Sequence, residues 1–124
     1  MTSCYVAVHT ITDTLAGYYT LSAADIPATD IPAEFTKRLP RYPTIPVARM
    51  GRLAIDTSFR RMGLGAGLLF DAVQRAGRAE IAMYALVVDA KDKNAEAFYR
   101  HHGFAIYGSS SGSLIAPLHV LLKA

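Results

Sequence analysis

A glycine-rich segment carries the strongest chemical signal in the sequence. Gly63, Gly65 and Gly67 follow the pair Arg60 and Arg61 and open a helical pattern. A residue without a Cβ lets backbone N–H groups approach phosphate oxygens, and a helix N-terminus adds about half a positive charge. The same glycines also suit a tight turn that packs a helix closely on a sheet. The segment therefore predicts an anion-binding loop or a turn of that kind.

The residues after the glycines exclude one phosphate-binding motif and argue against another. A P-loop ends in Gly-Lys-Ser or Gly-Lys-Thr, whereas Gly67 is followed by Leu68 and Leu69, which excludes a P-loop ATPase. A dinucleotide-binding fold needs Gly-x-Gly-x-x-Gly in a larger doubly wound domain. This chain has Gly-x-Gly-x-Gly, and it is too short for a separate substrate domain.

Basic residues crowd into one part of the chain. There are 13 Lys and Arg against 10 Asp and Glu, which gives a net charge of +3 at pH 7. This excess suits a polyanionic partner or an acidic cofactor. The crowded cations are Lys37, Arg38, Arg41, Arg49, Arg52, Arg60 and Arg61. They predict either a solvated basic face or an anion site.

Length and composition bound the class of protein. With 124 residues, 52% of them hydrophobic, we expect one domain over residues 1–124. Cys4 is the single cysteine, so an internal disulfide is excluded, and the side-chain clusters that bind zinc or iron–sulfur groups are absent from the sequence. We expect no metal. The first residues do not resemble a signal peptide, and no apolar run is long enough to span a membrane. We expect a cytoplasmic protein.

Strand and helix patterns predict the secondary structure around the glycines. The first predicted helix runs from Leu64 to about Ala79 because apolar residues recur on one face, at Leu64, Leu68, Leu69, Val73 and Ala76. A second helix is predicted over 94–102. The predicted strands are residues 4–9, 15–21, 47–55, 84–88, 104–107 and 118–122. This order predicts an α/β fold, an α+β sandwich around a mixed sheet.

Local signals add detail to these elements. Gly17 marks a β-bulge, Gly103 a left-handed cap that stops the second helix, and Asp56 a cap for the turn after its strand. Residues 22–46 contain five prolines, so they predict a long loop with one helical turn over 33–38.

Two ordered motifs resemble the GCN5-related N-acetyltransferases. Leu53-Ala54-Ile55-Asp56 followed by Arg60-Arg61-Met62-Gly63-Leu64-Gly65 is similar to the family's pyrophosphate-binding signature, Gln/Arg-x-x-Gly-x-Gly/Ala. Further on, Asn94-Ala95-Glu96-Ala97-Phe98-Tyr99 and then Gly103-Phe104 resemble the family's Asn, Ala-x-x-Phe-Tyr and Gly-Phe segment. The resemblance covers roughly residues 47–122. It implies a mixed, mostly antiparallel central sheet with flanking helices, and an acetyl-CoA-dependent N-acetyltransferase.

The resemblance also implies roles for individual residues. The strand residues Leu53, Ala54 and Ile55 would bind the pantetheine arm of acetyl-CoA through their backbone. The pyrophosphate would be held by Arg60, Arg61, Met62, Gly63, Leu64, Gly65 and Ala66, and Asn94 and Phe98 would face the cofactor. Tyr99 is the candidate general acid for the departing thiolate, since a phenol with a pKa near 10 is protonated at neutral pH. The alternative is a core tyrosine beside Phe98.

Softer similarities point to the tRNA-acetylating toxins of toxin–antitoxin modules. They lie in Tyr18-Tyr19-Thr20-Leu21, Thr44-Ile45-Pro46-Val47 and Pro117-Leu118-His119. The family normally carries a further strand and helices before the first strand of this sequence, so we expect a truncated frame or a partner that supplies the missing wall. The partners that we expect are acetyl-CoA, aminoacyl-tRNA, an antitoxin protein and a second copy of the chain. Alternatives are a small or protein amine as acceptor, or a domain that binds acyl-CoA or a partner without turnover.

Amine chemistry favours an α-amine as acceptor. Only the neutral amine attacks, and an α-amine with a pKa of about 7.7–8.0 is about one tenth neutral at pH 7, whereas lysine at about 10.4 is far less so. No strong base is evident in the sequence to make up the difference. The basic residues Lys37, Arg38, Arg41, Arg49 and Arg52 could hold the phosphates of a tRNA acceptor stem.

Overall fold

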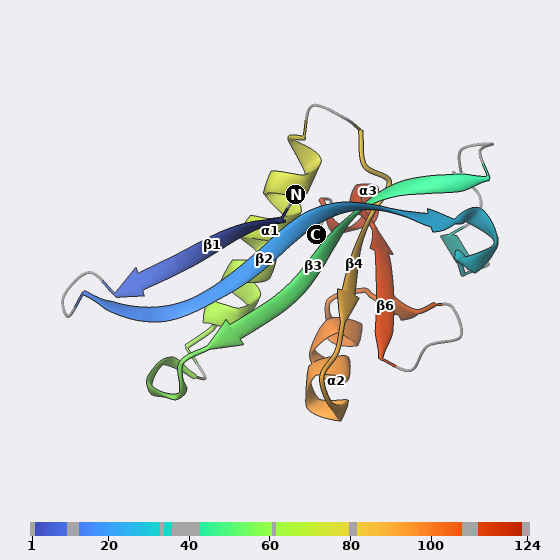
Figure 1. The fold of residues 1–124 in the computed structure, drawn as a ribbon. Helices are drawn as coiled ribbons and strands as arrows, with labels where there is room; N and C mark the ends of the chain where they lie inside the picture. Colours follow the sequence, from blue (N-terminus) through green and yellow to red (C-terminus); the bar gives the residue numbers. More distant parts are fainter. Residues whose placement is uncertain are drawn as a thin grey trace.

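A six-stranded sheet with helices along its length forms the fold (Figure 1). The computed structural model describes residues 2–9, 13–32, 34–35, 43–60, 62–79, 82–107 and 112–122. The strands are β1 (Thr2–His9), β2 (Thr14–Pro27), β3 (Thr44–Ile55), β4 (Ala85–Asp89), β5 (Ala105–Ile106) and β6 (Ser113–Pro117). The helices are α1 (Leu64–Gly77), α2 (Lys93–His101) and α3 (Leu118–Leu121), with short 3-10 turns η1 (Ala28–Asp30) and η3 (Thr57–Phe59).

One parallel contact interrupts an otherwise antiparallel sheet. The strand order is β1-β2-β3-β4-β6-β5, and among these neighbours only β3 and β4 run parallel. The connection between the two parallel strands contains α1, as a parallel crossover requires. The predicted mixed, mostly antiparallel sheet is therefore confirmed.

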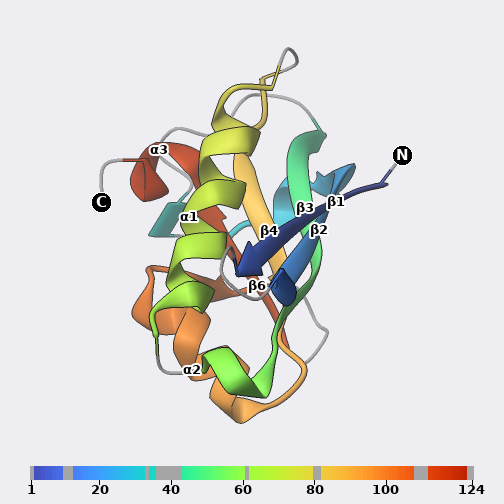
Figure 2. The ribbon, with the colours of Figure 1, turned by 90° about the vertical axis from the view of Figure 1, so that its left-hand side faces the viewer.

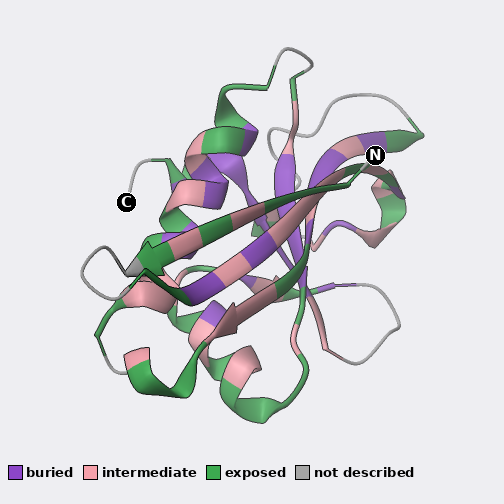
Figure 3. Ribbon diagram, turned by 60° about the vertical axis from the view of Figure 1, so that its left-hand side comes forward, coloured by how far each residue is buried: buried purple, intermediate pink, exposed green. Residues whose placement is uncertain are grey.

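Side chains alternate between two apolar clusters, one on each face of the sheet. In β4, Leu86 and Val88 join a cluster with all three helices, whereas Val87 packs on the opposite face with Ile45 and Ile115. Period-two alternation in the central strands produces this division. Figure 2 shows α1 and α3 on the same side of the sheet, and Figure 3 shows buried residues on the central strands with mostly exposed or half-buried ones on β1.

Helix α1 forms where the apolar periodicity predicted it. Its buried residues Leu68, Leu69, Ala72, Val73 and Ala76 lie on one face and pack on β2 and β3. Beside this face, Asp71 accepts hydrogen bonds from the hydroxyl of Tyr19 and, at 2.9 Å, from Nε of Arg75. These contacts fix the helix against β2.

Several local predictions hold. Gly103 has φ +99° after α2, and the Asp56 carboxylate accepts a hydrogen bond of 2.8 Å from the N–H of Ser58. The register of β1 and β2 shifts where Ala7 pairs with Gly17 and Val8 pairs with Leu15, so the bulge lies next to Gly17. No helix in the described part of the chain is long and apolar enough to cross a membrane.

The predicted long loop over residues 22–46 is wrong at both of its ends. Strand β2 continues to Pro27, and β3 already begins at Thr44. Pro27 is the last residue of its strand, and Pro46 precedes the first β3–β4 pair, Val47 with Ala85. A missing N–H costs a sheet least at such positions. The helical turn predicted over 33–38 lies outside the described residues except at 34–35.

The predicted strand over 118–122 is also wrong. Residues Leu118–Leu121 form α3, and the last strand is instead β6 over Ser113–Pro117, which lies between β4 and β5 and which the sequence patterns did not predict. Leu118 and Leu121 are both buried, which a helical turn achieves at this spacing. Periodicity does not separate helix from strand in so short an apolar run.

Candidate active site

The two parallel strands separate at one end of the molecule. Strands β3 and β4 pair from Val47 with Ala85 to Met50 with Val88, and beyond Met50 strand β3 pairs with β2 alone (Figure 1). A bulge lies at this point, since Gly51 and Arg52 together face the single residue Thr20 of β2. The N–H of Arg52 donates to Oγ1 of Thr20 at 3.1 Å, and a Cβ on Gly51 would lie 2.9 Å from that oxygen. The bulge bends β3 away from β4.

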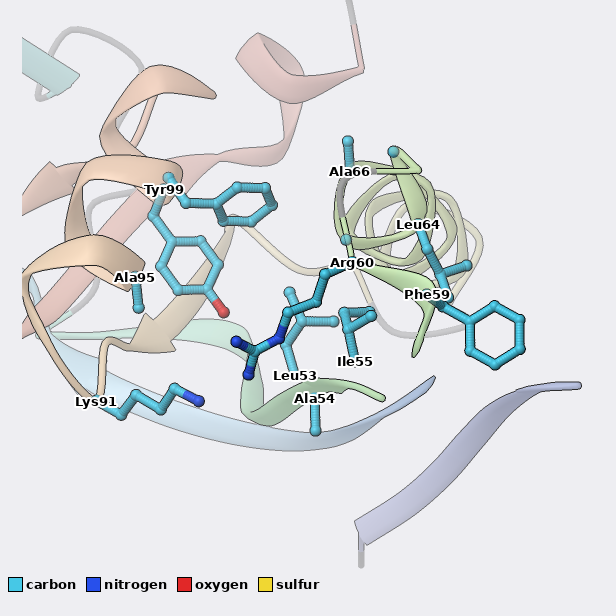
Figure 4. Close-up of a pocket in the computed structure, with 13 residues that line it drawn as sticks. Leu53, Ala54, Ile55, Phe59, Arg60, Leu64, Ala66, Lys91, Ala95 and Tyr99 are labelled. Atoms are coloured by element: carbon cyan, nitrogen blue, oxygen red, sulfur yellow. The ribbon is translucent and has the colours of Figure 1, made fainter. Parts of the chain in front are cut away.

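A cavity of about 460 Å³ occupies this gap. Its walls are the end of β3, the loop and first turn of α1, and one side of α2 (Figure 4). The lining residues are Leu53, Ala54, Ile55, Phe59, Arg60, Gly63, Leu64, Gly65, Ala66, Lys91, Ala95, Phe98 and Tyr99. Since β3 lacks a strand partner here, its backbone groups on this edge can bind an extended ligand.

The glycine loop presents the start of α1 to the cavity. Gly63 caps the helix with φ 78°, and its carbonyl accepts the N–H of Gly67 at 3.0 Å. The N–H groups of the first helical turn have no partner within the helix. A Cβ on Gly63 would meet nothing within 4 Å, and one on Gly65 would come 3.7 Å from the ring of Phe98. There is room beside these N–H groups for an anion.

Charge in the cavity has one sign. The lining contains the cations Arg60 and Lys91 and, among the residues the structure describes, no acidic side chain. In Figure 4 the guanidinium of Arg60, the ammonium of Lys91 and the hydroxyl of Tyr99 converge on the same space. The remaining walls are mostly apolar. A ligand with an anionic end and a long, weakly polar arm fits this combination.

Tyr99 is both a core residue and a cavity residue. It is 5% exposed, and its ring makes edge contacts with Phe98 and Phe104 at centroid distances of 5.3 and 5.5 Å. Its hydroxyl nevertheless faces the cavity (Figure 4). Burial, and then the charge of Asp89, raise the pKa of Tyr99 to about 12. The phenol therefore keeps its proton at neutral pH and can donate it into the cavity.

Helix α2 holds Tyr99 in place. Asp92 caps the helix by accepting the N–H of Ala95 at 2.8 Å. Ala95 lies one turn before Tyr99 and lines the same cavity. The rings of His102 and Phe98 make an edge contact at a centroid distance of 4.8 Å, and burial together with neighbouring His101 lowers the pKa of His102. Neither histidine lines the cavity.

Most of the site residues predicted from sequence meet here. Ten line the cavity: Leu53, Ala54, Ile55, Arg60, Gly63, Leu64, Gly65, Ala66, Phe98 and Tyr99. Met62 and Asn94 do not line it: Met62 is 68% exposed, and Asn94 is exposed on the first turn of α2. Arg61 lies outside the described residues. The cavity also contains Phe59, Lys91 and Ala95, which were not predicted from the sequence. Ala95 is part of the Ala-x-x-Phe-Tyr segment and could have been included, whereas no motif in the sequence pointed to Lys91.

A second cavity of about 480 Å³ opens from the same gap. Its residues Leu53, Ala54, Lys91, Ala95 and Tyr99 also line the first. The rest of its wall is Tyr18, Gly51, Arg52, Asp89 and Ala90. The two cavities thus meet at Tyr99, which is the arrangement that a reaction between two bound substrates needs.

The basic residues predicted to hold tRNA are placed only in part. Lys37, Arg38 and Arg41 lie outside the described residues. Arg49 is engaged in an ion pair, with its Nη1 3.1 Å from Oδ2 of Asp89. Arg52 is exposed and lines the second cavity.

Known proteins share this sequence pattern and fold. The profile of the family described as "Acetyltransferase (GNAT) domain" matches residues 38–112. A "tRNA-acetylating toxin" of Mycobacterium tuberculosis is 34% identical over 110 residues, which are 87% of this chain and 61% of the relative. The chain therefore spans less than two thirds of that relative's length.

Solved structures agree with the sequence matches. A mutant of KacT in which a tyrosine is replaced by phenylalanine has a TM-score of 0.85 at 27% identity, and AtaT complexed with acetyl-methionyl-tRNAfMet has 0.84 at 28%. Each match covers 97% of this chain and 73% of the other. AtaTR bound with AcCoA has a TM-score of 0.78 at 27% identity and covers 97% and 72%.

Proposed function

This chain belongs to the GNAT acetyltransferase family, and from that membership we propose that it moves an acetyl group from acetyl-CoA to the α-amine of an aminoacyl-tRNA. The observation that carries the proposal is the meeting of two cavities at the hydroxyl of Tyr99. One holds the glycine loop and cations, and the other is open to an acceptor. The proposal takes residues 1–124 as one catalytic domain that works in the cytoplasm.

The first cavity has the chemistry that acetyl-CoA requires. The open N–H groups after Gly63 and the guanidinium of Arg60 suit the pyrophosphate, and the unpaired edge of β3 at Leu53–Ile55 suits the amides of the pantetheine arm. When bound, acetyl-CoA would supply a thioester. The acceptor ammonium loses one proton to solvent, and the nitrogen of the neutral amine then bonds the carbonyl carbon of the thioester as the C–S bond breaks. The products are an amide and a thiol.

Tyr99 is the general acid in this proposal. Its hydroxyl holds a proton at the junction of the cavities, where the departing sulfur needs one. The raised pKa of Tyr99 keeps the donor loaded, and solvent restores the proton after each turnover. The KacT structure to which this chain is similar is that of a tyrosine-to-phenylalanine mutant, which is a further reason to test a tyrosine in this chain.

The acceptor class rests on the relatives and on amine chemistry. One relative is named as tRNA-acetylating, and AtaT has been solved with an acetylated aminoacyl-tRNA. In the described part of the site no histidine lines either cavity, so an acceptor with a low amine pKa is favoured. An antitoxin protein is a further proposed partner, since AtaT has been solved bound to the C-terminus of the antitoxin AtaR.

Transfer of labelled acetyl groups tests the proposal directly. The chain is incubated with acetyl-CoA and, in parallel, with charged tRNA, uncharged tRNA, a histone-like peptide and a polyamine. We expect label in charged tRNA only. Label in the peptide or polyamine alone would refute the tRNA acceptor and leave the acetyltransferase assignment. Tight acetyl-CoA binding by calorimetry with no transfer to any amine would favour the alternative, a domain that binds acyl-CoA without turnover.

Charge reversal in the basic stretch tests tRNA binding separately. Arg38→Glu together with Arg41→Glu should raise the KM for tRNA and leave the affinity for acetyl-CoA unchanged, because these cations are proposed to meet phosphates of the acceptor stem. Arg78→Glu, at the far end of α1, is the matched control. An unchanged KM in the double variant would remove these arginines from the tRNA site.

A further inference from the structure

One carboxylate distinguishes the second cavity from the first. Among the described residues that line either cavity, Asp89 is the single acidic one, and it lines only the second. Resting on the proposed function, we infer that Asp89 binds the ammonium form of the acceptor amine and so positions its nitrogen beside Tyr99. The geometry thereby assigns Asp89 as a positioning and specificity residue for the acceptor.

Asp89 is held rigidly by the sheet. It is the last residue of β4 and pairs with Ser113 of β6. The hydroxyl of Ser113 donates to Oδ1 at 3.1 Å, and Arg49 donates to Oδ2 at 3.1 Å. The next residue is fixed as well, since the N–H of Ala90 donates to the carbonyl of Gly112 at 2.7 Å. Backbone and carboxylate are therefore both oriented before a ligand arrives.

The carboxylate of Asp89 can accept further hydrogen bonds from a ligand. An ionised carboxylate offers about four lone-pair sites, and the two side-chain donors, Ser113 and Arg49, occupy two. The side chain of Asp89 is 49% exposed and borders the cavity that ends at Tyr99. An ammonium has three donors and suits the remaining sites.

Stability alone does not account for the arrangement. Both partners of the Arg49–Asp89 ion pair are about one third to one half exposed, and such pairs contribute little to stability. In the second cavity the ion pair would moderate the effect of the carboxylate on a bound amine. An isolated carboxylate would raise the pKa of a bound amine and hinder formation of the neutral nucleophile, and the neighbouring guanidinium weakens that effect.

Paired probes measure recognition of the ammonium without turnover. Adenosine carrying a 3′-amide-linked glycine, alanine, methionine or phenylalanine is compared, by calorimetry near pH 6.5, with the matching probe that has an α-hydroxyl. We expect the wild-type chain to prefer the amino probes by about tenfold, the size of one charge-assisted hydrogen bond. Asp89→Asn should reduce the preference to about one with the acetyl-CoA affinity unchanged, which also shows that the variant folds.

Two further variants test whether the preference depends on the carboxylate of Asp89 in particular. Asp25→Asn removes the same charge from an exposed position of β2 that lines neither cavity, and it should keep the tenfold preference. Arg49→Gln leaves the carboxylate without its cation, so it should increase the preference. A preference that survives in Asp89→Asn, or that is lost equally in Asp25→Asn or Arg49→Gln, overturns the inference.

The outcome also separates this inference from the proposed function. Charged tRNA acetylated by a chain that shows no preference for amino probes would overturn the role of Asp89 alone. A chain that binds no amino probe and acetylates no charged tRNA would overturn both.

Discussion

The two cavities that meet at Tyr99 are nearly equal in volume but were built in different ways. The first takes twelve of its thirteen lining residues from two short stretches of sequence, 53–66 and 95–99, with charges of one sign. The second draws Tyr18 from β2, Arg52 from β3 and Asp89 from β4, and it carries both signs. A contiguous site can be recognised as a motif, whereas a site assembled from separate strands becomes visible only when the sheet has formed.

The largest effect that we expect falls on the residue common to both cavities. Tyr99→Phe should lower kcat by about 10²- to 10⁴-fold, the usual range for loss of a general acid, while acetyl-CoA affinity stays unchanged. Single-turnover kinetics and calorimetry measure the two quantities. Tyr107→Phe, a buried tyrosine of the opposite face, should leave kcat unchanged. An undiminished rate of chemistry in Tyr99→Phe would make Tyr99 a packing residue.

The pH profile of the same reaction offers an independent measurement. Because the pKa of Tyr99 is raised to about 12, the phenol keeps its proton through the pH range in which the acceptor amine becomes neutral. The rate should therefore rise through about pH 8 with the amine and show no fall below about pH 10. A fall in the rate within that range, in a chain that remains folded by circular dichroism, would contradict the assignment.

A substitution confined to the first cavity should come next in size. Gly65→Asp should weaken acetyl-CoA binding by about 100-fold, because it places a carboxylate beside the N–H groups of the first turn, where an anion is expected. Gly67→Asp adds the same charge to the same turn of α1 outside this cavity, and it should weaken binding far less. Calorimetry with CoA compares the two. Equal losses would show that net charge at the helix start, and not the cavity, is responsible.

Two arginines separate the cavities more finely, since Arg60 lines only the first and Arg52 only the second. Arg60→Ala should raise the Kd for acetyl-CoA by about tenfold, the size of one charged hydrogen bond, and leave the KM for tRNA unchanged.

Arg52→Ala should have a smaller effect, and this effect should fall on tRNA and not on acetyl-CoA. We expect a KM for charged tRNA raised a few-fold, a salt dependence reduced by about one ion and an unchanged affinity for acetyl-CoA, because loss of one phosphate contact acts this way. Titration of tRNA at several salt concentrations measures both effects. If either arginine variant altered both ligands equally, the division into a cofactor cavity and an acceptor cavity would be wrong.

The smallest effect should be on stability, through the contact between β2 and α1. Tyr19→Phe removes the hydroxyl bonded to Asp71 and should lower the free energy of unfolding by about 1 kcal/mol near pH 7, measured by urea denaturation. Tyr5→Phe, whose ring stacks on Tyr19, is the matched control and should change stability less.

Acid titration of stability checks the same contact. The Tyr19 hydrogen bond holds the pKa of Asp71 below its ordinary value of 3.8, so this stabilisation is present above that pH and is lost as the pH falls through the lower folded value. Tyr19→Phe should therefore lose less stability than the wild type between about pH 5 and pH 2. Parallel curves for the two proteins would show that the hydrogen bond does not act through Asp71.

Helix α1 and the turn at Asp56 show what local sequence determined. The apolar spacing from Leu68 to Ala76 allows one helical face, and Asp56 and Gly103 act through hydrogen bonds or backbone angles of their immediate neighbours. The errors lie where neighbours in space decide. Residues 118–121 became a helix because both leucines could enter the core there, and β2 and β3 were lengthened by pairing with each other.

The family, the glycine loop and the position of Tyr99 on its helix could be predicted from the sequence, because those signals depend on residues close together in the chain. Tertiary structure alone decided that β3 leaves β4 after Met50, that Lys91 reaches the first cavity and that Asp89 stands between Ser113 and Arg49 in the second. Those contacts join residues up to 40 positions apart. Their pairing depends on strand order and on a bulge at Gly51, and no local pattern of residues specifies either.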